Sequence, residues 1–179
     1  MYFRIIIPNY NSGDWIRKCL NSVDGQTFKD YVLVIVDDCS TDGSRSIIEE
    51  YAKEHDLVGA YMSKVKLFNG GARKKGLQIS RSLDTKYTLF LDSDDWFVDD
   101  YVLEKIHNKL EEHEVDCLTL PYKPLIGKSL VSQELIRNTR KDLVESVFVA
   151  CWTKCIKSDL IVPFPENTLM EDVVQHIAH

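Results

Sequence analysis

Hydrophobic residues in this chain form short, nearly continuous runs that alternate with segments of helical spacing. The runs cover 2–8, 31–36, 58–62 and 87–91, the length and character expected of strands that are buried on both faces. Between the runs, apolar residues recur every three or four positions, which is typical of helices that pack on one side. Strands that alternate with helices predict a parallel sheet covered by helices on both faces.

The intervening segments contain recognisable helix starts. Ser12 or Asp14 is placed to cap the first helix, and a turn-rich segment precedes the second. The first 120 residues therefore predict an α/β fold with a doubly wound, mostly parallel, Rossmann-like sheet, and such sheets bind ligands at the carboxyl ends of their strands. The predicted helices cover about 14–24, 44–55, 69–82 and 99–113, and a fifth strand covers 116–120.

After Pro121 the alternation weakens. Length alone favours a single domain over 1–179, long enough to bury a core. The remaining predictions are an irregular hairpin over 122–130, a helix over 132–149, a short ambiguous element over 150–157, a turn over 163–167 and a helix from 170.

Two groups of carboxylates follow predicted strands. Asp37 and Asp38 follow the second strand, and Asp92, Asp94 and Asp95 follow the fourth. Carboxyl ends of parallel strands share one edge, so both groups are expected at the same edge of the sheet. Three acids this close repel one another unless a cation lies among them, and aspartate oxygens suit Mg²⁺ or Mn²⁺. An acid cluster after a strand is also typical of a solvated loop or a helix N-terminus, and this alternative stays open.

Composition excludes several classes of protein. Hydrophobic residues make up 44% and charged residues 28%, which indicates a globular chain, and the net charge of −6 argues against nucleic acid as a partner. No apolar run approaches the ~20 residues of a membrane span. Five cysteines without a CxxC pair favour a reduced, cytoplasmic protein. No GxGxxG follows the first strand, so a classical NAD-binding protein is not expected, and His176 with His179 lacks the HExxH pattern of a zinc site.

Four motifs follow one another along the chain: 5–11 with 22–28, then 36–44, then 69–76 leading to 91–95, and finally 163–166 followed by Glu171-Asp172. Each motif alone is a weak signal, but their order and spacing along nearly the whole chain are specific. Together they resemble glycosyltransferase family 2, the inverting family with a GT-A type fold. The resemblance implies a nucleotide-sugar-binding part over 1–120 and an acceptor-side part over 121–179, with a UDP-sugar as the first expected donor.

The resemblance implies that the nucleotide lies against the first two loops. Pro8, Tyr10 and Asn11 fall in the loop that borders the base. Asp38 resembles the acid that hydrogen-bonds the base, and Asp37 either shares this role or braces the loop. The carboxylate oxygens would accept hydrogen bonds from the base.

Further along the chain, the resemblance assigns a basic residue and the metal-binding acids. Arg73 resembles the residue that braces either the diphosphate or the acids beneath it. Asp92, Ser93 and Asp94 match the DxD motif, in which Asp92 contacts the ribose or the metal shell. Asp94 and Asp95 are the expected ligands of Mn²⁺ or Mg²⁺, which would neutralise the diphosphate leaving group.

The late acid pair is implied to be catalytic. Asp172 resembles the general base that takes the proton of the acceptor hydroxyl during an in-line displacement, and Glu171 orients it or contacts the acceptor. Trp152 and Lys154 resemble the segment that lines the sugar and acceptor pocket. The implied acceptor is a glycan or a lipid-linked sugar in the synthesis of a surface polysaccharide.

The chain departs from the family at its end, because only seven residues follow Asp172. We interpret it either as a fragment or as a compact member completed by a partner or by a homodimer. Peripheral association with the inner face of the membrane stays open. The alternatives are a catalytically silent nucleotide-binding or interaction module and a nucleotidyltransferase, neither of which needs Asp172 as a base.

Overall fold

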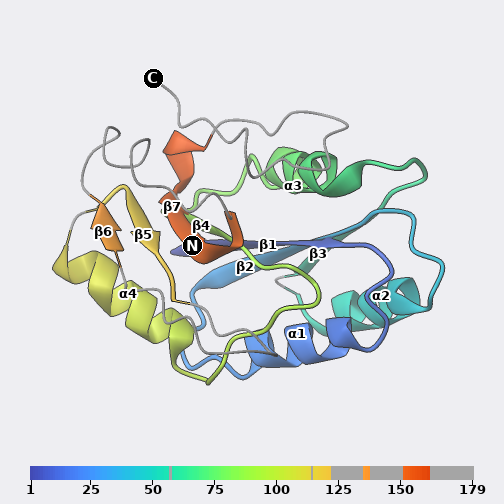
Figure 1. Ribbon diagram of the computed structural model, residues 1–179, viewed down its shortest axis with the longest axis horizontal. Coiled ribbons are helices and arrows are strands. Elements are labelled where there is room, and N and C mark those ends of the chain that lie inside the picture. The colour runs from blue at the N-terminus through green and yellow to red at the C-terminus, as the bar shows by residue number, and fades with distance from the viewer. Residues whose placement is uncertain (57, 114, 122–134, 138–150, 162–179) are drawn as a thin grey trace.

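Seven strands form one sheet in the order β3-β2-β1-β4-β7-β5-β6 in the computed structural model of the chain (Figure 1). The structure describes residues 1–56, 58–113, 115–121, 135–137 and 151–161. The strands are β1 (Phe3–Asn9), β2 (Tyr31–Asp37), β3 (Val58–Met62), β4 (Tyr87–Phe90), β5 (Cys117–Thr119), β6 (Leu135–Arg137) and β7 (Lys154–Lys157).

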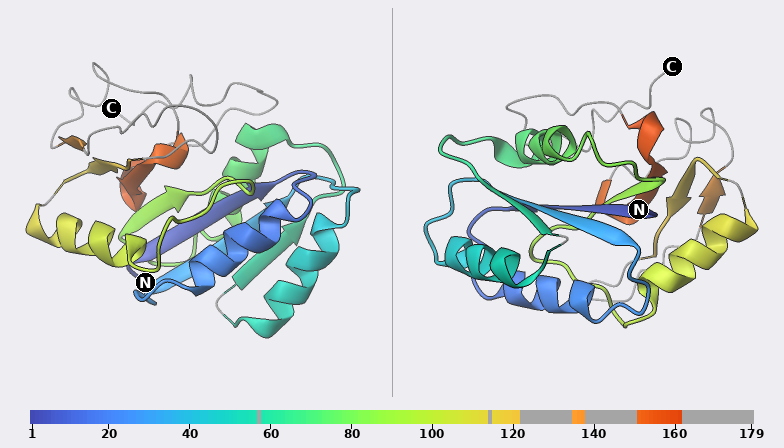
Figure 2. Two further views of the ribbon diagram at one scale, coloured as in Figure 1. Left: turned by 60° about the horizontal axis from the view of Figure 1, so that its bottom comes forward. Right: turned by 180° about the vertical axis from the view of Figure 1, so that it is seen from behind.

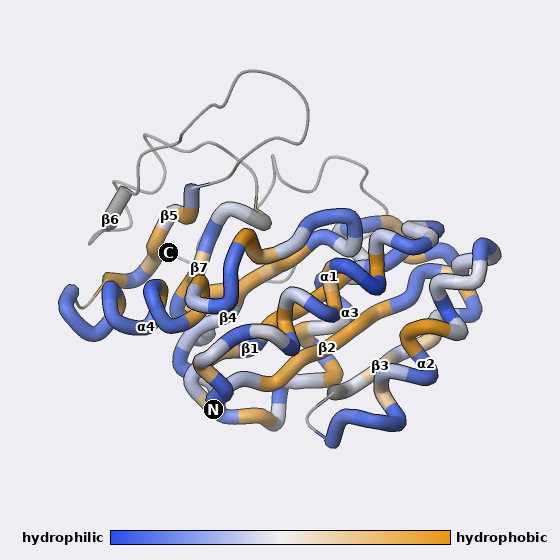
Figure 3. Tube along the Cα trace, turned by 90° about the horizontal axis from the view of Figure 1, so that it is seen from below, coloured by the Kyte–Doolittle hydropathy of each residue, from blue (hydrophilic) through white to orange (hydrophobic). Residues whose placement is uncertain are grey.

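Strand β1 lies in the parallel half of the sheet, and all seven of its residues are buried. It pairs in parallel with β2 on one side and β4 on the other, and β3 continues the parallel pairing beyond β2. Figure 3 shows the strong hydrophobic character of β1 and β2, which follows from their burial on both faces. The order β3-β2-β1-β4 confirms the doubly wound fold predicted from the alternating pattern.

Helices cover both faces of this sheet (Figures 1 and 2). Helices α1 (Trp15–Asp24), α2 (Ser44–Glu54) and α4 (Val102–Glu112) lie on one face, and α3 (Phe68–Ile79) lies on the other. One core contains Ile16 of α1, Ile48 of α2 and Leu103 of α4. On the α3 face, Ala72 packs with Ile6 and Phe90.

Helix α3 approaches the sheet closely at Gly76. A Cβ atom at this position would lie 2.6 Å from the Ile6 side chain in β1. Glycine therefore allows the helix to pack against the strand at a distance that a larger residue would prevent. This contact fixes the helix that carries Arg73.

The second half of the sheet is antiparallel. Strand β7 pairs antiparallel with both β4 and β5, and β6 pairs antiparallel with β5. The short 3₁₀ turns Cys151–Thr153 and Ser158–Leu160 flank β7. Five strands, β1 to β5, point the same way, so the sheet is mostly parallel as predicted.

One predicted element is wrong. The helix expected over 132–149 does not form at Leu135–Arg137, which is strand β6 paired with β5. A run of three residues carries no periodicity that separates strand from helix, and here the edge of β5 supplied the hydrogen-bonding partner. The rest of that predicted helix, the hairpin over 122–130, the turn over 163–167 and the helix from 170 lie outside the described residues.

Smaller differences concern the ends of elements. Helix α4 begins at Val102, so Asp99 and Asp100 precede it rather than form its first turn. Asp14 occupies the N-cap of α1 but makes no side-chain capping bond. None of the helices in the described ranges combines the length and apolar character that a membrane span requires.

Candidate functional site

The loops that follow β1, β2 and β4 meet at the carboxyl edge of the parallel strands. Asn9 and Asp37 pair at the end of β1 and β2, so the two following loops start at the same level. Outside glycine, positive φ angles occur at Asn11, Cys39 and Phe68, all near this edge. Such conformations are uncommon for residues with a side chain, and they cluster at functional sites. The backbone strain therefore marks the same edge as the carboxylates.

Asp37 is fully buried, and its carboxylate hydrogen-bonds to the neighbouring loops. Its carboxylate accepts hydrogen bonds from the Asn9 side-chain amide at 2.8 Å and from the Ser40 backbone N–H at 3.2 Å. The same Asn9 amide also lies 3.1 Å from the hydroxyls of Ser40 and Ser44. These contacts tie the end of β1 to the start of α2, which matches the loop-bracing role that the sequence left open for Asp37.

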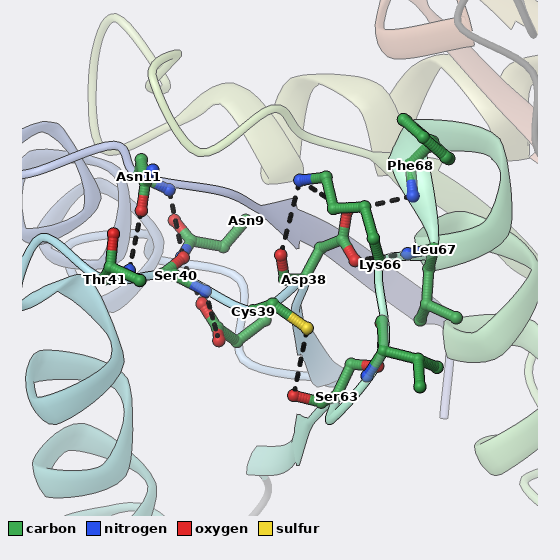
Figure 4. A network of polar contacts seen from close by, with 12 residues as sticks. Asn9, Asn11, Asp38, Cys39, Ser40, Thr41, Ser63, Lys66, Leu67 and Phe68 are labelled. Atoms are coloured by element: carbon green, nitrogen blue, oxygen red, sulfur yellow. Dashed lines mark hydrogen bonds and ion pairs between the residues drawn. The ribbon is translucent and has the colours of Figure 1, made fainter.

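Asp38 is buried beside Asp37 and holds the start of α3 (Figure 4). Its two carboxylate oxygens accept the backbone N–H groups of Leu67 and Phe68, at 2.5 and 2.9 Å. These N–H groups belong to the first turn of α3, which has no intrahelical acceptor for them. Lys66 adds an ion pair to Asp38 at 2.9 Å. A carboxylate offers about four acceptor positions, so these three donors leave room for one more.

Lys66 also covers the ring of Tyr10. Its ammonium nitrogen lies 2.7 Å from the centre of the Tyr10 ring, which is half exposed on the loop after β1. The cation is attracted both by the ring face and by Asp38. This side chain therefore links the first loop to the start of α3 across the predicted base site.

Asn11 bridges the first two loops in a left-handed conformation (Figure 4). Its backbone N–H donates to the Ser40 hydroxyl at 3.0 Å, and its side-chain oxygen accepts from the Thr41 backbone N–H at 2.8 Å. Pro8 is buried within β1 opposite Val36. The structure thus places Pro8 and Asn11 in the framework around Tyr10.

The predicted DxD motif follows β4 directly. Arg73 reaches it from α3, and one guanidinium nitrogen lies 2.5 Å from Asp92 Oδ1. Arg73 is only 1% exposed. Of the two roles expected for this residue, bracing the acids is the one that the described contacts match. Ser93 is buried beneath the turn, in which the Asp95 backbone N–H donates to the Asp92 carbonyl at 2.9 Å.

Asp94 and Asp95 face the surface at this turn. Partial burial of the carboxyl group, and then the negative charges of Asp92 and Asp94, raise the pKa of Asp95 to about 6, although the residue as a whole is exposed. Burial and the charges of the same three acids also raise the pKa of the Cys19 thiol, which donates to the Asp92 carbonyl at 3.7 Å. The loop therefore places three carboxylates close together, two of them at the surface.

This arrangement fits a divalent cation that shares its ligands with a bound phosphate. Within the described part of the chain, no group of three or more His, Cys, Asp or Glu side chains has the geometry of a complete metal site. Mg²⁺ in phosphate-handling enzymes is commonly held by one or two carboxylates together with substrate phosphates. Asp94 and Asp95, two neighbouring carboxylates at the surface, match that incomplete protein set.

Beside the acids, two tryptophans stack in parallel. The rings of Trp15 and Trp96 lie 5.9 Å apart at an angle of 3°, and Lys18 lies 3.3 Å from the centre of the Trp96 ring. Trp15 is 46% exposed, so its helical spacing with Ile16 and Cys19 did not predict its environment. Its partner comes from the loop after β4, which helical periodicity does not reveal.

Several expected site residues lie beyond these contacts. Glu171 and Asp172 are outside the described residues, and so is the side chain of Trp152. Lys154 is 7% exposed at the start of β7, beside β4 and β5. The sequence reading missed Asn9 and Lys66. Asn9 carried a signal, since a polar residue directly ends a buried strand, but nothing local marked Lys66.

Comparison with known proteins finds relatives that are named as sugar transferases. A poly(ribitol-phosphate) beta-glucosyltransferase of Bacillus spizizenii is 33% identical over 93% of this chain and 27% of its own length. The poly(ribitol-phosphate) beta-N-acetylglucosaminyltransferase TarS of Staphylococcus aureus is 29% identical over 93% of this chain and 30% of its own length. The chain thus spans less than a third of the length of these two relatives.

TarS is also among the solved structures that resemble this chain. The crystal structure of S. aureus TarS 1-349 in complex with UDP has a TM-score of 0.75 and 27% identity, and the match covers 96% of this chain and 53% of that one. The sequence profile of glycosyl transferase family 2 matches residues 4–143, most of the chain. The fold, the order of the motifs and this match agree, and the chain belongs to glycosyl transferase family 2.

Proposed function

We propose that the protein transfers a sugar from a nucleotide-diphosphate sugar, with a UDP-sugar as the first candidate, to a hydroxyl of a surface glycan, a lipid-linked sugar or a related polymer. The observation that carries the proposal is the acid turn after β4. Asp94 and Asp95 remain at the surface there, while Asp92 is held by Arg73. Family membership makes an inverting, single-displacement transfer the expected reaction.

The donor class rests on the loops after β1 and β2. The ring of Tyr10 is half exposed and offers a stacking surface, and Asp38 retains acceptor capacity for a base N–H. TarS has been solved in complex with UDP. We therefore assign Tyr10 and Asp38 to the base, with Pro8, Asn11 and Asp37 as the framework that holds them.

We assign Asp94 and Asp95 to a divalent cation, Mn²⁺ or Mg²⁺. When bound, such a cation neutralises a diphosphate and stabilises it as a leaving group. Asp92 and Ser93 set the start of the turn, and Arg73 keeps Asp92 in place from the opposite face of the sheet. We assign to these residues the support of the turn that carries the two carboxylates.

Residues 1–120 would then bind the donor, and 121–179 would serve the acceptor. We assign the general base to Asp172, with Glu171 beside it, from their place in the motif order. Two relatives act, by their names, on poly(ribitol phosphate). A hydroxyl-rich polymer of this kind is accordingly the first acceptor to test.

Calorimetric titration of UDP, GDP and CDP tests the donor site. With Mn²⁺ present, we expect UDP to bind and EDTA to abolish most of that binding. Equal binding with and without metal would contradict the cation assignment. No binding of any nucleotide would favour the silent interaction module.

Asp172→Asn tests the base. We expect it to abolish transfer while the metal-dependent affinity for UDP stays within twofold of wild type. Full transfer by this variant would show that Asp172 is not the base. Loss of both transfer and nucleotide binding would indicate a structural role instead.

A further inference from the structure

The end of α1 and the loop before β2 belong to the family motifs. Together they cover Ser22 to Phe28 and lie against the stretch from Phe97 to Glu104, immediately after the acid turn. The segment also contacts other parts of the fold, since Asp24 accepts from Tyr51 and Phe28 packs on Phe3. Its hydrogen bonds to the chain that leaves the acids nevertheless suggest a role exerted through those acids.

Gln26 is the main contact between the two segments. Its side chain is 1% exposed, and its amide nitrogen donates to the carbonyls of Ser22 at 3.0 Å and Asp99 at 2.7 Å. Its amide oxygen accepts the backbone N–H of Leu103 at 2.9 Å. Leu103 lies in the first turn of α4, where Tyr101 at the N-cap supplies no side-chain bond. Gln26 thus caps α4 from a distant part of the chain.

Three neighbours reinforce this attachment. The Ser22 hydroxyl accepts the Phe97 backbone N–H at 3.1 Å, and the Thr27 backbone N–H donates to the Asp100 carbonyl at 2.8 Å. A Cβ atom on Gly25 would lie 2.7 Å from the Asp100 carboxylate, so glycine permits the close approach. The chain after the acid turn is therefore fixed at its backbone by four contacts, at residues 97, 99, 100 and 103.

The other end of the turn is fixed as well. Arg73 holds Asp92, and the Leu91 backbone N–H donates to the Ile6 carbonyl at 3.0 Å. Asp94 and Asp95 consequently lie on a short arch between Asp92 and Phe97, and each end of this arch is tied to a different element. The direction of their carboxylates depends on both attachments.

We propose that Gln26 is a positioning residue for the divalent cation. By fixing where the arch ends, it holds Asp94 and Asp95 in the orientation that a cation requires. Carboxylates that become ordered only when the cation binds have a lower affinity for it, because the entropy lost on ordering makes the binding free energy less favourable. The inference rests on the proposed function and adds a residue to it that touches neither cation nor nucleotide.

The test is binding of Mn²⁺ in the presence of UDP, measured by calorimetry. Gln26→Met keeps the approximate volume and removes all three hydrogen bonds. We expect its half-saturating Mn²⁺ concentration to rise about tenfold, the lower end of the range for residues that orient metal ligands. The affinity for UDP at saturating Mn²⁺ should stay within twofold of wild type, which separates positioning from general damage.

Ser22→Ala is a second, milder variant that removes the acceptor for the Phe97 backbone N–H and the hydrogen bond that the Ser22 hydroxyl donates to the Cys19 carbonyl. We expect it to raise the half-saturating Mn²⁺ concentration about threefold, and it keeps the proposal testable if Gln26→Met does not fold. Tyr51→Phe is the matched control, because it removes a 2.6 Å hydrogen bond to Asp24 on another side of α1. It should lower stability without changing the Mn²⁺ requirement.

Folded Gln26→Met and Ser22→Ala proteins with the Mn²⁺ requirement of wild type would overturn the inference. An equal rise in Tyr51→Phe would also overturn it, since the effect would then reflect loosening of the whole fold. If the wild-type chain bound UDP without any dependence on Mn²⁺, the proposed function and this inference would fail together. If UDP binding by the wild type depends on Mn²⁺, but both variants require the same Mn²⁺ concentration as wild type, only this inference fails.

Discussion

The two acid groups at the carboxyl edge have the same residue type and the same place after a strand, yet their surroundings differ. Asp37 and Asp38 are buried, and their oxygens accept amide, backbone and ammonium donors from three segments. In the second group, the described residues give Asp92 such a partner in Arg73, while Asp94 and Asp95 lie at the surface. Within the described residues, the first group is satisfied by hydrogen bonds and one ion pair, whereas the second presents two carboxylates at the surface.

This difference separates two uses of a carboxylate. A buried acid with satisfied hydrogen bonds organises the loops around it, and removing it leaves unpaired donors. An acid whose neighbours disfavour ionisation, such as Asp95 with its pKa near 6, gains when a cation arrives. Stability should therefore depend on the first group, and metal-dependent binding on the second.

Removing both surface acids should have the largest effect on binding. We expect the double variant Asp94→Asn with Asp95→Asn to weaken Mn²⁺-dependent UDP binding by on the order of 100-fold, since even residues behind the ligands typically contribute 10–100-fold. Its melting temperature should equal or slightly exceed that of wild type, because like charges are removed. Calorimetry and thermal unfolding measure both effects. Retained binding would show that the cation lies elsewhere.

Removing Asp38 should have the opposite profile. Asp38→Ala leaves the backbone N–H groups of Leu67 and Phe68 without their acceptor, and we expect a loss of about 2–3 kcal/mol in the free energy of unfolding. Chemical denaturation measures it. Glu49→Ala is the control, because its ion pair with Arg45 is exposed and should contribute almost nothing. A stability equal to wild type would contradict the organising role of Asp38.

Asn9 should show a smaller structural effect. Asn9→Ala removes the amide that donates to buried Asp37, and we expect a loss of about 1–2 kcal/mol in stability. The Mn²⁺ concentration required for UDP binding should change little, because the network does not touch the acid turn. If Asn9→Ala strongly raised the required Mn²⁺ concentration without lowering stability, the two acid groups would act together rather than separately.

Lys66 should give the smallest effect. Lys66→Met removes a partly exposed ion pair and the contact with the Tyr10 ring, and we expect a loss of about 0.5–1 kcal/mol. Lys157→Met is the matched control, because this lysine is exposed to a similar extent and pairs with Asp116 at 3.3 Å. Denaturation of the two variants side by side measures the difference. An identical, negligible effect in both would show that the Tyr10 contact adds nothing to stability.

Local pattern was sufficient for the parallel half of the fold. The apolar runs became β1 to β4, and the helical spacing became α1 to α4, with ends displaced by up to three residues. Leu135–Arg137 was predicted to be helical and is a strand, because its conformation depends on the edge of β5 rather than on its own residues. The half-exposed Trp15 is similar, since its stacking partner Trp96 lies far away in the sequence.

The sequence by itself determined that acids follow strands, and that these acids share an edge, because parallel strands deliver their carboxyl ends to one side of a sheet. It could not decide which acids would remain available. That depended on donors brought from distant segments: Asn9 to Asp37, the start of α3 to Asp38, and Arg73 to Asp92. Hydrogen bonds between segments far apart in the chain leave no local periodicity, and only the tertiary structure shows that Gln26 fixes the path of the chain after the acid turn.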